Sequence, residues 1–137
     1  MPTFCLDTNI VIFAINRRRP AATARLESEL SARTSVWISA IALFELEFGI
    51  ARSDRADKSA ALLTEFLAAG VEIIPFEAED ARHAGDIRSH LARLGTPIGH
   101  YDLLIAAQAR RRGAVLVTAN GREFARVPGL TIEDWAA

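Results

Sequence analysis

Short apolar runs with strand character alternate with helical segments along this chain of 137 residues. Each run is too short and too apolar to form a strand with one solvated face. The pattern therefore predicts a parallel sheet covered by helices on both faces. The expected strands are residues 3–6, 35–38, 71–75, 114–118 and 130–132. Ligands of such sheets bind beyond the carboxyl ends of the strands, so a functional site is expected there.

Helices are expected in the intervals between these runs. Proline suits the first turn of the helix that begins at Pro20, and glycine ends two others at Gly70 and Gly95. The expected helices are residues 9–15, 20–32, 40–52, 56–69, 77–94 and 100–112. No repeat, low-complexity tract or linker interrupts the pattern, so residues 1–137 are predicted to form a single domain.

The composition excludes several classes of protein. Half of the residues are apolar and the formal net charge is −1, which indicates a packed core and not a disordered chain. Cys5 is the only cysteine, so neither a disulfide framework nor a cysteine-rich zinc site is expected. The sequence lacks a signal peptide and any apolar stretch of the ~20 residues that a membrane span requires. These features predict a cytoplasmic protein without membrane contact.

An acid or its amide occurs at four positions where a strand or loop gives way to a helix, or on the helix itself. They are Asp7, Glu45, Asp102 and Asn120. Asp102 shares a helix stripe with small apolar residues, where a carboxylate is unfavourable unless another group pairs with it. If the fold gathers the three carboxylates, their repulsion calls for a cation, and oxygen ligands suit Mg²⁺ or Mn²⁺.

Three of these residues also have an ordinary structural explanation. Asp7 fits the N-cap of a helix. Asp102 fits a first helical turn, where the helix dipole favours an acid. Asn120 precedes a glycine, and the pair is typical of turns.

Glu45 shares its helix with Glu47, and periodicity does not separate the two acids cleanly. Gly49 lies one turn after Glu45 and weakens the helix by roughly 1 kcal/mol relative to alanine. Such a glycine suggests a close approach by another group, which favours Glu45 as the functional acid.

The sequence around the four positions resembles the PIN domain, and specifically the VapC toxins of toxin–antitoxin systems. The resemblance covers nearly the whole chain and rests on LDTNI, ISAIALFELEFG, GHYDLLIAAQA and LVTANGREFARVPGLTIEDW. It implies a PIN-like three-layer sandwich and an endoribonuclease that cleaves RNA by metal-activated water. Many PIN domains carry aspartate at the position of Asn120. Asparagine brings no charge, so the resemblance supports a first metal ion but not a second.

The resemblance also implies a role for each residue. Asp7 and Asp102 correspond to primary metal ligands, and Glu45 to a ligand through water or a general base. Asn120 corresponds to a residue that positions water or metal. Minor polar roles near the site are implied for Thr8, Asn9, Ser39 and Thr118.

The partners implied by the resemblance are an RNA substrate, a cognate VapB-like antitoxin and a second copy of the chain. Helices 20–32 and 56–69 are candidates for the homodimer contact. Arginines 17–19 and 110–112 each end a helix, where cations interact favourably with the dipole, and they are also candidate contacts for the RNA backbone or for an acidic antitoxin tail.

Two alternative functions remain. A PIN fold that has lost catalysis would act as a binding module, and Asn120 is the feature that supports it. A signalling receiver domain also has an acidic pocket, but it needs a lysine after a late strand, and here residues 118–120 occupy that place.

Overall fold

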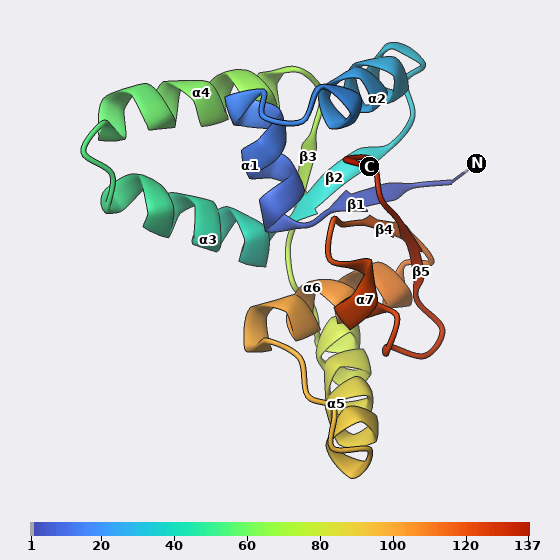
Figure 1. Ribbon diagram of the computed structural model, residues 1–137. Helices are drawn as coiled ribbons and strands as arrows, with labels where there is room; N and C mark the ends of the chain where they lie inside the picture. The colour runs from blue at the N-terminus through green and yellow to red at the C-terminus, as the bar shows by residue number, and fades with distance from the viewer. Residues whose placement is uncertain (1) are drawn as a thin grey trace.

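The structure, a computed structural model, describes residues 2–137 and contains one five-stranded sheet (Figure 1). The strand order is β3-β2-β1-β4-β5, and every neighbouring pair is parallel. The strands are Phe4–Leu6 (β1), Val36–Ser39 (β2), Glu72–Ile74 (β3), Val115–Val117 (β4) and Thr131–Glu133 (β5). The predicted parallel sheet is confirmed.

Helices connect successive strands and form the two outer layers. They are Thr8–Asn16 (α1), Pro20–Ser31 (α2), Ala40–Ala51 (α3), Ala56–Ala68 (α4), Ala78–Arg93 (α5), His100–Arg111 (α6) and Gly121–Phe124 (α7). After β1, the chain adds β2 and β3 in order on one side of β1 and then returns to place β4 on the other side of β1. Right-handed crossovers place helices from these two directions on opposite faces. Accordingly, α1 to α4 lie on one side of the sheet and α5 to α7 on the other (Figure 1).

The reversal of direction between β1 and β4 creates a topological switch point at the centre of the sheet. In open α/β sheets, ligands bind in the crevice at this point, beyond the carboxyl ends of the strands. Asp7 follows β1 and Thr118 follows β4, and the Asp7 amide donates a hydrogen bond to the Val117 carbonyl (3.0 Å). The topology thus places polar residues where a ligand is expected.

The central strands are buried, but the two edge strands are not. Both β1 and β2 are buried along their whole length, whereas Glu72 of β3 is exposed and Ile73 is 41% exposed. The expectation that every strand is too apolar to be half-exposed is therefore wrong for β3, and also for β5, where Thr131 is exposed. An edge strand has one neighbour and lies at the margin of the helical layers, so side chains there reach solvent.

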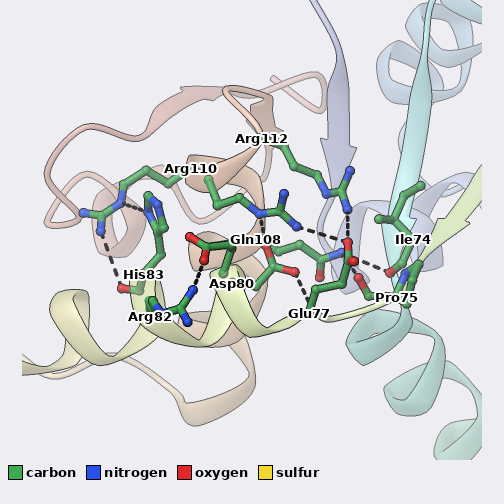
Figure 2. A network of polar contacts seen from close by, with 11 residues as sticks. Ile74, Pro75, Glu77, Asp80, Arg82, His83, Gln108, Arg110 and Arg112 are labelled. Atoms are coloured by element: carbon green, nitrogen blue, oxygen red, sulfur yellow. Dashed lines mark hydrogen bonds and ion pairs between the residues drawn. The ribbon is translucent and has the colours of Figure 1, made fainter.

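An ion-pair network joins α5 to α6 on the side of the sheet away from α1 (Figure 2). Asp80 is fully buried, and its Oδ1 accepts a hydrogen bond from Arg111 Nε (2.7 Å). Asp80 Oδ2 accepts from the Glu77 backbone amide (2.7 Å), at the start of α5. Glu77 in turn accepts from Arg111 (3.2 Å) and Arg112 (2.8 Å). The network raises the pKa of Arg111, chiefly through its hydrogen bond to Asp80.

Arg110 and Gln108 extend this interface. Arg110 donates to His83 Nδ1 (3.0 Å) and to Asp86 Oδ2 (2.8 Å). The buried Gln108 amide donates to the carbonyls of Ile74 (3.0 Å) and Pro75 (3.2 Å), just before α5. Arginines 110–112 are therefore engaged with acids and carbonyls of their own chain, which disfavours the hypothesis that they contact RNA.

The closing Glu-Asp-Trp sequence has a structural role. Trp135 is buried edge-on against Phe4 of β1, with ring centroids 5.0 Å apart, and its Nε1 donates to Glu133 (3.0 Å). The Arg25 guanidinium of α2 lies 4.9 Å from the Trp135 ring. These contacts hold the C-terminal segment against the sheet and α2.

No helix within residues 2–137 combines the length and the apolar character that crossing a membrane requires.

Candidate active site

Asp7 is both a helix cap and a buried acid at the switch point. It is the N-cap of α1, where its Oδ1 accepts a hydrogen bond from the Ile10 amide (2.9 Å), and only 4% of it is exposed. Burial raises the pKa of the Asp7 carboxyl, and hydrogen bonds from Thr118 and Ile10 oppose the rise. The nearby carboxylate of Glu45 raises this pKa further. A cap needs no burial, so capping alone does not account for Asp7.

Glu45, and not Glu47, faces Asp7. The Thr8 hydroxyl donates to Glu45 Oε1 (2.7 Å), which ties α3 to the first turn of α1. Glu45 is half-buried, whereas Glu47 is exposed. The tertiary contact favours Glu45 over Glu47 as the acid of the site, which periodicity left open.

Gly49 borders an open groove. The groove has a volume of about 250 Å³ and lies between α1, α3 and α4, where its lining includes Ile12, Glu45 and Leu63. A Cβ built on Gly49 meets nothing within 4 Å. No group of residues 2–137 makes the close approach that the glycine suggested.

We expect Gly49→Ala to raise the free energy of unfolding by about 1 kcal/mol, because alanine restricts the unfolded chain and the site has room for a methyl group. Chemical denaturation measures the change. Gly95→Ala is the matched control. It should destabilise the fold, because Gly95 has a φ of +68°, which alanine adopts poorly. Stabilisation by both variants would contradict this reasoning.

Asp102 lies half-buried in the first turn of α6, close to three other acids. Desolvation, together with smaller contributions from the carboxylates of Glu123, Glu45 and Asp7, raises the pKa of the Asp102 carboxyl to about 6. A Cβ built on Gly99 would lie 3.3 Å from Asp102 Oδ2, so the glycine leaves room beside this carboxylate. Residues from β1–α1, α3, α6 and α7 thus converge on one acidic site.

Glu123 is the site residue that sequence reasoning missed. Its Oε2 accepts a hydrogen bond from Asn120 Nδ2 (2.7 Å), and its Oε1 accepts from the Gly99 amide (3.2 Å) at the start of α6. It contributes the largest charge effect on the Asp102 pKa. The signal available in the sequence was an acid three residues after Asn120, but α7 is a single turn and too short for periodicity to reveal.

Asn120 is linked to the acidic site by its hydrogen bond to Glu123. Its amide donates to that carboxylate, and its backbone N–H donates to Thr118 Oγ1 (2.9 Å). Glu123 thus brings a carboxylate beside Asn120, which itself carries no charge. The site therefore contains four carboxylates.

The minor polar residues divide into two groups. Thr8 and Thr118 contact acids of the site, as expected. Ser39 caps α3 by accepting from the Ile41 amide (2.9 Å), and Asn9 is exposed, with no hydrogen bond from its side chain among the described contacts of residues 2–137. Ser39 thus has a structural role that accounts for it.

Arginines 17–19 lie at the other end of α1 from Asp7. The helix has nine residues, which places the run roughly 13 Å from the acids along its axis. All three are exposed, and Arg19 lies 4.8 Å from the Phe13 ring centroid. The run remains a candidate RNA or antitoxin contact.

The four acids suit a hard divalent cation by chemistry. All their donor atoms are oxygens, and burial together with the neighbouring carboxylates raises the pKa of Asp102, which a bound cation would oppose. Within residues 2–137, no three His, Cys, Asp or Glu side chains already form a group that could hold a metal ion. Mg²⁺ commonly takes one or two carboxylates and keeps several waters, so a closed protein cage is not required.

The raised pKa of Asp102 predicts a pH dependence of stability in the presence of a chelator. The native state binds the Asp102 proton up to about pH 6, whereas an unfolded aspartate releases it near pH 4. The contribution of this group is therefore fully present below about pH 4 and is lost as pH rises through 6. Thermal unfolding of the wild type and Asp102→Asn tests this. The melting temperature of Asp102→Asn relative to that of the wild type should rise between pH 5 and 7. A difference in melting temperature that does not change with pH would contradict the prediction.

Comparison with known proteins identifies the family of this fold. The PIN domain family model matches residues 4–130. A structure of VapBC2 from Rickettsia felis bound to a promoter DNA fragment is similar, with a TM-score of 0.91, 37% identity, and coverage of 97% of this chain and 98% of that chain. The chain belongs to the PIN domain family and, within it, to the VapC ribonucleases.

Two bacterial relatives show how far the similarity extends. The tRNA(fMet)-specific endonuclease VapC of Salmonella typhimurium is 41% identical over 98% of this chain and 99% of its own length. The protein of the same name from Shigella flexneri is 38% identical over 99% of this chain and its entire length.

Proposed function

We propose that this protein is a divalent-metal-dependent endoribonuclease and the toxin of a VapBC-type pair, acting in the cytoplasm. The observation that carries the proposal is the convergence of four carboxylates on the switch point, where Asp102 has a pKa of about 6. A packed domain has no structural need for such an acidic cluster, since the repulsion opposes folding. The family provides the substrate class, RNA.

In this proposal, Asp7 and Asp102 bind Mg²⁺ or Mn²⁺ directly. The bound cation would stabilise the charge of the scissile phosphate and lower the pKa of an attacking water. Glu45, which accepts a hydrogen bond from the Thr8 hydroxyl, would accept the water proton or bind the cation through water. Glu123 and Asn120 hold the loop before α6 and thereby position Asp102.

A titration with MgCl₂ tests the metal step without relying on activity. We expect heat of binding and a rise in melting temperature at pH 7.5 for the wild type, and neither for Asp102→Asn. MnCl₂ provides the second cation. Absence of binding with either salt would favour the alternative, a catalytically inert PIN module.

The antitoxin and dimer are part of the same proposal. The Salmonella and Rickettsia neighbours were solved as VapBC complexes bound to DNA, and we propose that this chain likewise binds a VapB-like antitoxin and forms homodimers. Sedimentation of the purified protein tests whether it forms homodimers. A monomer at high concentration would contradict it.

A further inference from the structure

An exposed aromatic pair joins α3 and α6, the helices that carry Glu45 and Asp102. The rings of Phe44 on α3 and Tyr101 on α6 meet edge-to-face, with centroids 5.3 Å apart and planes at 69°. Phe44 is 51% exposed and Tyr101 is 47% exposed. Each ring precedes a site acid in sequence, Glu45 and Asp102 respectively. The pair thus bridges the two helices that carry half of the carboxylates.

The fold itself does not account for these rings. Large apolar side chains gain stability when they are removed from water, yet about half of each ring here remains in solvent. An edge-to-face pair also leaves ring surface open to a further planar group. Phe44 and Glu45 are neighbours on α3, and Tyr101 and Asp102 are neighbours in the first turn of α6, so the ring pair lies on the same two helix segments as these acids.

We propose that Phe44 and Tyr101 form a stacking platform for an unpaired nucleotide next to the scissile phosphate. The inference rests on the proposed ribonuclease function and assigns to these two rings the contact with an unpaired base at the cleavage site. Proteins recognise unpaired bases by stacking them on exposed aromatic rings, whereas bases within a duplex are covered by their neighbours. Proximity to the acids favours RNA over a protein partner as the occupant.

Binding of a fluorescent single-stranded RNA dodecamer tests the proposal, measured by anisotropy in an Asp7→Asn background that prevents cleavage. We expect Phe44→Ala and Tyr101→Ala each to weaken binding roughly fivefold to a hundredfold, the range of single-base stacking. Tyr101→Phe, which retains the ring, should bind as tightly as the background. A blunt-ended RNA duplex of the same length, which has no unpaired nucleotide, should bind weakly to all variants.

Phe48→Ala is the matched control. Phe48 lies one turn further along α3 and is 60% exposed. Its ring is 6.0 Å from the Arg52 guanidinium, whereas Tyr101 pairs with Phe44. This variant should bind RNA like the background. Equal losses for Phe48→Ala and Phe44→Ala would overturn the proposal, because the effect would then belong to the helix surface in general.

Dodecamers with a single abasic position distinguish stacking from other contacts. One abasic position should weaken binding to the background protein but not to Phe44→Ala or Tyr101→Ala.

If both alanine variants bind RNA normally and instead sediment at a lower mass than the background, the rings form a contact between copies and the proposal is wrong. Failure of the wild-type protein to cleave RNA with saturating MgCl₂ or MnCl₂ would instead refute the proposed function, which keeps the two failures distinguishable.

Discussion

Asp7→Asn is expected to reduce magnesium-dependent RNA cleavage at least about a hundredfold, the scale of losing one charged group that stabilises a transition state. Asparagine has the shape of aspartate and caps helices equally well, so the hydrogen bond to the Ile10 amide should survive. What the variant loses is the charge. Cleavage of a labelled RNA at pH 7.5 with saturating MgCl₂ measures the effect.

The thermal stability of Asp7→Asn shows whether a loss of cleavage comes from the lost charge or from unfolding. Burial raises the pKa of Asp7, so the ionised carboxylate opposes folding at neutral pH when no cation is present. Asp7→Asn should therefore unfold in EDTA at a temperature no lower than the wild type. Asp7→Ala, which also removes the cap, should lose about 1 kcal/mol relative to Asp7→Asn. Wild-type cleavage by a folded Asp7→Asn would remove Asp7 from the metal site.

Asp80→Ala is expected to lower the free energy of unfolding by about 3 kcal/mol. The change removes a fully buried carboxylate that accepts from both Arg111 Nε and the Glu77 amide (Figure 2). Hydrogen bonds to charged groups contribute about 1.5–3 kcal/mol each, and the Glu77 amide also loses its partner at the start of α5. Urea denaturation followed by circular dichroism measures the loss.

Two companion variants sharpen this prediction. Asp80→Asn retains an acceptor and should lie between the wild type and Asp80→Ala. Glu79→Ala changes the neighbouring acid, whose pair with Arg82 is exposed, and should alter stability by less than about 0.5 kcal/mol. Equal effects at positions 79 and 80 would show that the buried network contributes little to the fold.

The sequence by itself determined the order and type of the main elements. Alternating short apolar runs and helical segments are local patterns, and they predicted the parallel sheet and the helices now called α1 to α6. The sequence also singled out Asp7 and Asp102 as candidate site acids, because a position after a strand or at a helix start is visible without coordinates. The two edge strands were misjudged, since exposure of a strand depends on its place in the sheet and not on its composition alone.

Only the tertiary structure decided which distant side chains meet. The hydrogen bond from Thr8 selected Glu45 over Glu47, and the single turn of α7 brought Glu123 beside Asp102 while Asn120 became its support. Arginines 110–112 proved to pair with acids of α5, which their own sequence context does not reveal. The physical reason is that strand order and helix packing set these distances, whereas sequence periodicity reports only on neighbours within one element.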